Sequence, residues 1–148
     1  MVAIPKKVAD ALPDVDPDER PDYEAMPEAH YLVKVVENKI EEAGPNSKTG
    51  ADMLALTMEI IQPREFSGRK VWDRLSFSDK ALWKLRSFFD AADYDFDSDV
   101  DEIQEDEAEF VIYLGTEVQK QGKGKGNLRN TVGEYLPADD ENMELVED

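Results

Sequence analysis

The chain has 148 residues, the usual size of one domain, and its 35 Asp plus Glu against 17 Lys plus Arg give a formal net charge of −18. The absence of cysteine excludes disulfides and thiolate chemistry, and a single histidine, His30, excludes a multi-histidine zinc site. No apolar run approaches the roughly 18 to 20 residues of a membrane span, and the first residues lack the apolar stretch of a signal peptide. We therefore expect a soluble, cytoplasmic protein without a membrane partner.

The acidic residues are concentrated in three segments. Residues 1–30 hold eight acids, three bases and five of the eight prolines, whereas residues 91–109 hold ten acids and residues 136–148 six, with no base in either. The rest of the chain has 11 acids and 14 bases, a local net charge of +3. This pattern predicts an extended, proline-rich acidic arm over 1–27, a mildly basic body over 28–137 and an acidic, flexible tail over 138–148. A mildly basic body of this kind can bind a polyanion.

The predicted elements of the body are five strands and one helix. Alternating and β-branched patterns predict strands at about 30–38, 52–62, 68–77, 110–120 and 127–136. Ser78 is a good N-cap for a helix that carries Leu82, Leu85, Phe88, Phe89 and Ala92 on one side, and the acidic stretch after it is predicted to be a solvated connector. Three strands, one helix and two strands is the chain order of a five-stranded OB-type barrel, a mainly β fold.

Five short segments also resemble a known family. They are Tyr31-Leu-Val-Lys-Val, Lys48-Thr-Gly-Ala-Asp-Met-Leu-Ala-Leu-Thr-Met-Glu-Ile, Gly68-Arg-Lys-Val-Trp-Asp-Arg-Leu, Ala81-Leu-Trp-Lys-Leu and Asn130-Thr-Val-Gly-Glu-Tyr-Leu-Pro137. Together they look like a family of small phage-encoded proteins, catalogued mainly as of unknown function and similar to phage single-stranded-DNA-binding proteins with an OB fold and an acidic C-terminal tail. The resemblance covers about residues 28–137, without the proline-rich arm. It implies binding of single-stranded DNA during phage DNA replication or recombination, in the host cell cytoplasm.

The third predicted strand offers the residue types that single-strand binding needs. Cations track phosphates and aromatic faces stack on bases. Lys70, Trp72 and Arg74 alternate, so one face of a strand presents cation, indole and cation roughly 6 to 7 Å apart. The alternative is that Trp72 belongs to the core, with Val71 and Phe77 outside, which would also bury the two cations.

Further candidates for DNA binding lie in the predicted strands and loops. Tyr113 offers a second stacking surface or, alternatively, packs at the barrel rim. The loop Gly122-Lys-Gly-Lys-Gly126 is either part of the binding face or a solvated hairpin tip. The remaining candidates are cations: Lys123 and Lys125 within that loop, Lys120 and Arg129 beside it, Lys48 between the first two strands, and Lys34.

Other conspicuous residues carry weaker functional signals. Trp83 lies off the apolar stripe of the helix, and His30 is interpreted as a surface or packing residue. The run from Asp93 to Asp101 fails as an EF-hand loop, because Ser98 stands where glycine is required and Gln104 where a bidentate glutamate belongs. A carboxylate-metal nuclease needs its acids on rigid elements, whereas these lie in segments predicted to be mobile. We therefore expect a non-catalytic protein without metal or cofactor.

Three functions remain open at this point. The first is a largely sequence-independent single-stranded-DNA-binding protein whose tail recruits replication or recombination proteins or folds back over the basic groove. The tail residues concerned are Asp139, Asp140, Glu141, Glu144, Glu147 and Asp148, with Leu145 and Val146 as its apolar contact. The second is an acidic DNA mimic that binds a basic host enzyme, although a mimic needs its carboxylates on a rigid surface. The third is a strand-annealing or recombination mediator with the same binding face.

Overall fold

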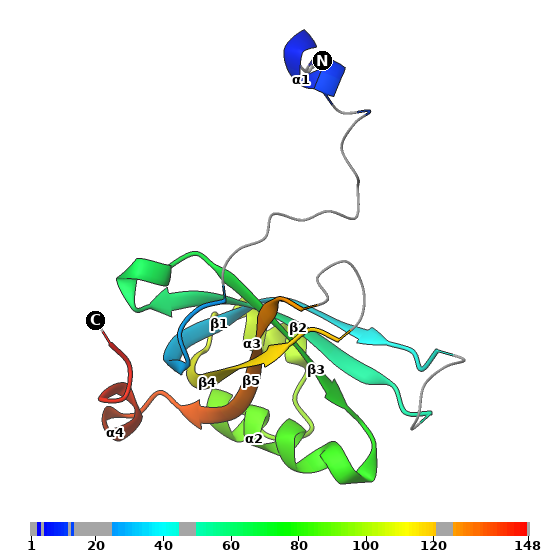
Figure 1. Ribbon diagram of the computed structural model, residues 1–148. Helices are drawn as coiled ribbons and strands as arrows, with labels where there is room; N and C mark the ends of the chain where they lie inside the picture. The colour runs from blue at the N-terminus through cyan, green and yellow to red at the C-terminus, as the bar shows by residue number, and fades with distance from the viewer. Residues whose placement is uncertain are drawn as a thin grey trace.

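Five antiparallel strands form one sheet in the computed structural model, which describes residues 3, 5–11, 13, 25–44, 50–120 and 126–147. They are β1 (Ala29–Glu41), β2 (Met53–Gln62), β3 (Lys70–Ser76), β4 (Glu109–Val118) and β5 (Leu128–Pro137), in the spatial order β3-β2-β1-β4-β5 (Figure 1). The predicted mainly β class and all five predicted strands are confirmed.

The sheet is not closed into a barrel, so the predicted closure is wrong at the level of backbone pairing. The strand order leaves β3 and β5 as the two edges. Side chains connect these edges instead, together with helix α2 (Leu82–Ala92), which contacts both strands. The Tyr135 hydroxyl on β5 donates a 2.7 Å hydrogen bond to Asp73 on β3, and Lys84 Nζ on α2 donates one of 2.7 Å to the Val132 carbonyl. Lys84 Nζ also lies 3.2 Å from the Asp73 carboxylate.

The connection between β3 and β4 holds more helix than the single one predicted. It contains a 3-10 turn at Asp79–Ala81, then α2, then the short α3 (Val100–Glu105). Phe88 and Phe89 of α2 are buried as expected, whereas Leu82, expected on the same side, is 43% exposed. Ser78 precedes the 3-10 turn rather than α2, and its side chain makes no capping hydrogen bond.

Helix α3 lies where the sequence predicted a solvated acidic connector. The Asp99 side chain caps it by accepting a hydrogen bond from the Asp101 amide, and Ile103 is fully buried. β4 pairs with β1 only as far as Lys34, so the second half of β1 has no strand on that side. Gln104 of α3 occupies this edge by donating its Nε2 to the Val36 carbonyl at 2.9 Å.

The main core lies between one face of the sheet and α2. T-shaped contacts join Phe88 of α2 to Phe110 of β4 and Tyr135 of β5. Met26, expected in the extended arm, also belongs to this core, with 2% of its surface exposed. Its amide donates to Asn130 Oδ1 and its carbonyl accepts from Asn130 Nδ2, both at 2.8 Å, which fixes the chain before β1 against β5.

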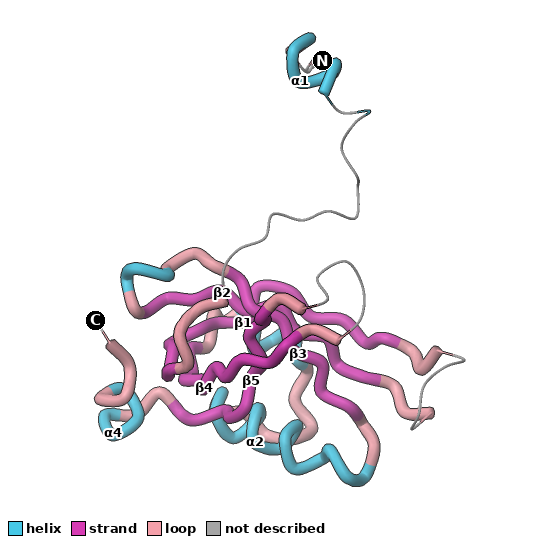
Figure 2. The backbone as a smooth tube through the Cα atoms, viewed as in Figure 1, coloured by secondary structure: helices cyan, strands magenta, loops and turns pink. Residues whose placement is uncertain are grey.

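The terminal segments differ from the expectation of extended or flexible tails. Residues Lys6–Ala11 form helix α1, while residues 14–24 of the arm lie outside the described residues. At the other end, α4 (Asp140–Met143) follows β5 (Figure 2), and Val146 forms a parallel β-bridge with His30. Only 8% of Val146 is exposed, so this segment packs on the body. No described helix is long and apolar enough to span a membrane.

Candidate nucleic-acid interface

The predicted exposure of Lys70, Trp72 and Arg74 on one face of β3 is confirmed. Val71 and Leu75 point into the core, whereas Lys70, Trp72 and Arg74 are exposed on the opposite side, here called the outer face of the sheet. Trp72 is 58% exposed, which excludes the alternative that it belongs to the core. Phe77, expected inside with Val71 and Leu75, is partly exposed just beyond the strand.

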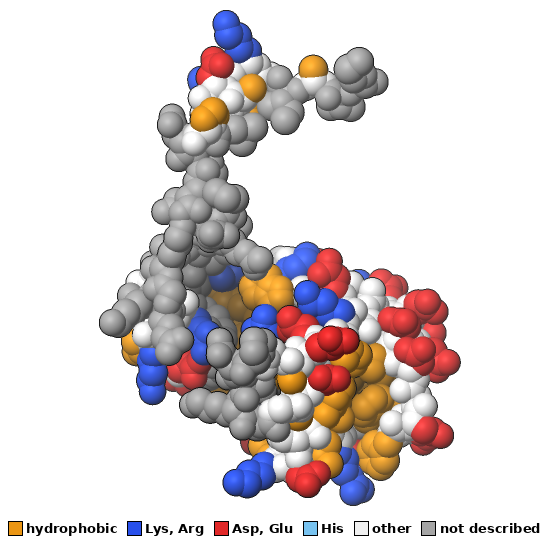
Figure 3. Space-filling view, turned by 90° about the vertical axis from the view of Figure 1, so that its right-hand side faces the viewer, with side chains coloured by type: hydrophobic (Ala, Val, Ile, Leu, Met, Phe, Trp, Pro, Cys, Tyr) orange, Lys and Arg blue, Asp and Glu red, His pale blue; other side chains and the backbone are white. Residues whose placement is uncertain are grey.

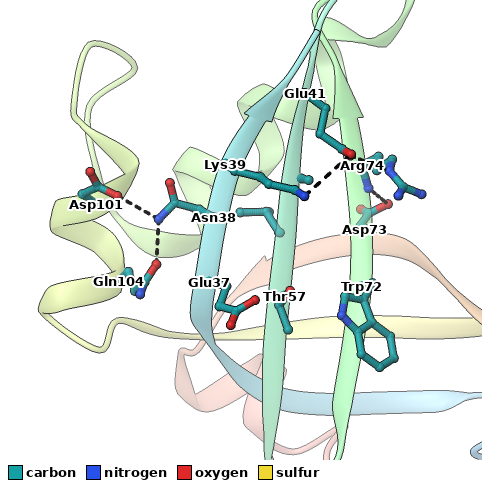
Figure 4. A pocket seen from close by; sticks show the side chains of 12 residues that line it. Glu37, Asn38, Lys39, Glu41, Thr57, Trp72, Asp73, Arg74, Asp101 and Gln104 are labelled. Carbon is teal, nitrogen blue, oxygen red and sulfur yellow. Dashed lines mark hydrogen bonds and ion pairs between the residues drawn. The ribbon is translucent and has the colours of Figure 1, made fainter. Parts of the chain in front are cut away.

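The strand register extends this face across β2 and β1. Trp72 pairs with Thr57 of β2, which pairs with Glu37 of β1, so these three residues form one row across the sheet (Figure 4). The neighbouring rows are Lys39–Ala55–Arg74 and Lys34–Glu59–Lys70. Lys34, a weak candidate from the sequence, thus lies on the same face as the three residues of β3.

Glu37 and Lys39 were not predicted to belong to this face. An irregularity in register between Val35 and Glu37 adds a residue to β1 and reverses the alternation that precedes it. Simple alternation from Lys34 would put Asn38 in line with Lys34, but Asn38 instead turns toward α3, where it bonds to Asp101 and Gln104. The sequence contains no glycine or proline at this point that would signal the bulge.

A polar groove of about 700 Å³ lies over these rows. Trp72 and Arg74 line it from β3, Thr57 from β2 and Glu37 from β1 (Figure 4). Asn38, Asp101 and Gln104 line it from the side of α3. Asn38 Nδ2 donates to Asp101 at 3.0 Å and to Gln104 at 2.7 Å, so this side of the groove is held by its own hydrogen bonds.

The cations of the outer face are matched by carboxylates. The pairs within 4.0 Å are Lys34–Glu107, Lys39–Glu41, Lys70–Glu59 and Arg74–Glu41. The hydrogen bond from Arg74 holds the pKa of Glu41 below its usual value, and the hydrogen bond to Glu107 raises the pKa of Lys34. Ion pairs between exposed groups contribute little net stability, so a phosphate can displace these carboxylates at small cost.

Tyr113 and the hairpin cations are placed differently. Tyr113 is half-buried on β4 and its ring packs against His30 at 5.1 Å, beside Gly133. His30 is near the start of β1, whereas the Trp72 row crosses β1 at Glu37. Tyr113 therefore packs on a neighbouring side chain and does not join the Trp72 row. This contact agrees with the interpretation of His30 as a surface or packing residue.

The remaining predicted cations lie around the β4–β5 hairpin or outside the described residues. Lys120 is exposed just after β4, and Arg129 of β5 is paired with Glu117 of β4. Lys48, Lys123 and Lys125 lie outside the described residues. Trp83, which the sequence left unassigned, is 62% exposed on α2.

The C-terminal segment covers a second, apolar part of the outer face. Val146 packs against Leu32 of β1 and Val111 of β4, and Met143 of α4 adds to the same small cluster. Asp139 caps α4 by accepting a hydrogen bond from the Asn142 amide at 2.8 Å. The other predicted tail acids are Asp140, Glu141, Glu144 and Glu147, which are exposed, and Asp148, which lies outside the described residues. The segment therefore docks on the apolar strip and not over Lys70, Trp72 and Arg74.

Within the described part of the chain, no three metal-ligating side chains gather into a potential site. The search of curated proteins finds no match to this sequence. A family described as "Protein of unknown function (DUF669)" matches residues 13–142. The match includes the body expected from the sequence and extends into the proline-rich arm and through most of α4. Because the match spans all five strands and most of the chain, this protein belongs to the DUF669 family of proteins of unknown function.

Proposed function

We propose that this protein is a non-catalytic single-stranded-DNA-binding protein that binds largely without regard to sequence. The observation that carries the proposal is the exposed indole of Trp72 between Lys70 and Arg74 on one sheet face. An exposed indole offers a flat surface on which any base can stack, and each stacked base contributes about 1 to 3 kcal/mol. The flanking cations stand where they can contact the phosphates on either side of that base.

The ion pairs of the outer face are compatible with this role. Arg74 and Lys70 are both exposed. Each pairs with one carboxylate, and the rest of its charged group remains accessible to solvent. A phosphate that replaces Glu41 at Arg74 keeps the guanidinium bonded, and the released carboxylate returns to water. The exchange conserves charge pairing and also releases counterions from the DNA, which favours binding at low salt.

The strand order supports an OB-type relationship as the finer description of the fold. The order β3-β2-β1-β4-β5 is that of an OB barrel opened between β3 and β5, the two strands that Asp73, Lys84 and Tyr135 connect. OB folds bind nucleic acid on the face of strands two and three. The groove beside Trp72 lies over β2 and β3, which is consistent with that mode.

The C-terminal segment and the family resemblance suggest the setting. A phage protein of this type acts in DNA replication or recombination in the host cytoplasm and needs contacts with other proteins of that machinery. The exposed acids of α4, together with Leu145, which is 49% exposed, form a short acidic and apolar surface for such a contact.

Tryptophan fluorescence tests the proposal. The chain has two tryptophans, so the Trp83→Phe variant reports on Trp72 alone, and the matched Trp72→Phe variant reports on Trp83 alone. Oligo-dT should quench Trp72 and leave Trp83 unchanged, the quenching should weaken at high salt, and duplex DNA should give no response. Trp72→Ala should lose about 1 to 3 kcal/mol of affinity for oligo-dT. Absence of any response to oligo-dT would reject the proposal.

One observation favours the acidic DNA mimic as a second candidate. A mimic needs fixed carboxylates, and the structure places Asp101, Glu102 and Glu105 on the ordered helix α3, anchored by buried Ile103. Acidic side chains also gather along one edge of the face shown in Figure 3. The oligo-dT titration distinguishes the two functions. A DNA mimic does not bind oligo-dT and instead competes with DNA for a basic enzyme.

A further inference from the structure

We propose that Glu37 reads the edge of the base that stacks on Trp72, so that the groove favours bases with an exocyclic amino group. The inference rests on the proposed function, because it concerns the same groove and the same DNA. It adds a base preference at one position to binding that is otherwise tolerant of sequence.

The register places Glu37 where a stacked base presents its edge. Glu37, Thr57 and Trp72 lie directly across from one another on three adjacent strands. Neighbouring strands are about 4.8 Å apart, so the row from Trp72 to Glu37 spans about 10 Å, which matches a base lying over Thr57. In Figure 4 the carboxylate of Glu37 extends toward Thr57, across the groove from the indole.

Glu37 differs from the other acids around the groove because none of the described residues bonds to its carboxylate. Glu41 is bonded to Arg74, Glu59 lies 4.0 Å from Lys70, and Asp101 accepts a hydrogen bond from Asn38. Glu37 is exposed and makes no hydrogen bond or ion pair with any of the described residues. Its acceptor capacity is therefore available to a ligand in the groove.

A free carboxylate in this position discriminates between bases. An ionised carboxylate only accepts hydrogen bonds, so it can bind the amino group of cytosine. Thymine presents a carbonyl oxygen at the same ring position, and two acceptors repel each other. Cytosine and thymine have the same ring size and nearly the same shape, so a preference between them reports on this polar edge.

Fluorescence anisotropy with oligo-dC and oligo-dT of equal length, near neutral pH, tests the inference. The unmodified protein should bind oligo-dC at least about five-fold more tightly, the ratio expected for one discriminating hydrogen-bonded contact. Glu37→Gln should bring the two affinities to within about two-fold, because the carboxamide can accept from cytosine and donate to thymine. Glu42→Gln removes the same charge just beyond β1, outside the groove, and should preserve the ratio.

The ratio separates base reading from general electrostatics. Loss of a negative charge strengthens binding to both oligonucleotides equally, so it cancels in the ratio. Equal affinities in the unmodified protein, or a cytosine preference that survives in Glu37→Gln with native circular dichroism, would overturn the inference and leave the proposed function standing. Failure to bind either oligonucleotide would overturn the proposed function itself, and the base preference with it.

Discussion

The Tyr135 hydroxyl donates a 2.7 Å hydrogen bond to the carboxylate of Asp73, and this bond joins the two edge strands of the sheet. Lys84 of α2 pairs with the same carboxylate and donates to the Val132 carbonyl of β5. Asp73 lies next to Trp72 in β3, so this network holds the strand that presents the indole. β3 and β5 share no backbone hydrogen bonds, so the contact between these two edges, here called the seam, depends on the side chains of Asp73, Lys84 and Tyr135.

Tyr135→Phe should lower the free energy of unfolding by about 1 to 3 kcal/mol, because it removes a hydrogen bond to a partly buried charged group. Urea denaturation measures the change. Tyr113→Phe is the matched control, since the Tyr113 hydroxyl has no hydrogen bond within the described part of the chain, and it should leave stability nearly unchanged. Equal effects of the two variants would show that the seam does not depend on this bond.

The same pair predicts how stability responds to alkaline pH. Burial and, in addition, the Asp73 carboxylate raise the pKa of Tyr135 well above its ordinary value of 10.0. The folded state therefore keeps this proton at a pH where the unfolded chain has lost it, so the stabilisation is complete below pH 10 and disappears as pH rises through the folded pKa. As pH rises above about 10, unfolding free energy should fall more steeply in the unmodified protein than in Tyr135→Phe. Tyr94, whose bond to Asp106 raises its pKa to about 12, contributes equally to both proteins and cancels.

Glu41→Gln should tighten binding of single-stranded DNA. Glu41 accepts the 2.7 Å hydrogen bond from Arg74 Nε and also lies 4.0 Å from Lys39, so its removal frees two cations of the outer face. We expect an affinity gain of about two- to ten-fold at low salt that shrinks as salt rises. Oligo-dT titrations at several salt concentrations measure it. Glu42→Gln removes one charge without freeing Arg74, and an equal gain in that variant would assign the effect to net charge alone.

Much of the sheet could be predicted from the sequence because strand alternation is a local signal. In β3 the pattern of Val71 and Leu75 against Lys70, Trp72 and Arg74 identified the exposed face, and burial confirms it. The same alternation cannot be carried through β1, because one extra residue after Val35 reverses which side chains point outward. The exposed face of a strand can be predicted beyond a bulge only when the position of the bulge is known.

Other features depended on tertiary contacts that no local pattern encodes. Helix α3 carries a single fully buried residue, Ile103, and lies beside the part of β1 that extends beyond its pairing with β4. The capping residue Asp99, followed three positions later by Glu102, was a usable signal within the acidic stretch. Docking of the C-terminal segment depends on Val146, with Met143 beside it, and the strip that they cover on β1 and β4 forms only in the folded sheet.

That docking yields a prediction about how the acidic segment acts. Val146→Asp places a charge against Leu32 and Val111 and should release the segment while retaining every natural acid. Burial of a valine side chain is worth about 1.5 to 3 kcal/mol, so unfolding free energy should fall by up to that amount. Leu145→Asp adds the same charge at a side chain that is 49% exposed and should leave stability nearly unchanged.

The effect on DNA binding distinguishes docking from charge. Deletion of residues 138–148 should tighten binding of oligo-dT and flatten its salt dependence at low salt, because six acids leave the protein. The docked segment covers the outer face beside His30 and Tyr113. If this covering is what weakens DNA binding, Val146→Asp should also tighten binding despite its added negative charge. Tightening by the deletion alone would show that the segment acts through its charge wherever it lies. Unchanged affinity in both variants would show that the segment does not compete with DNA and would leave partner recruitment as its role.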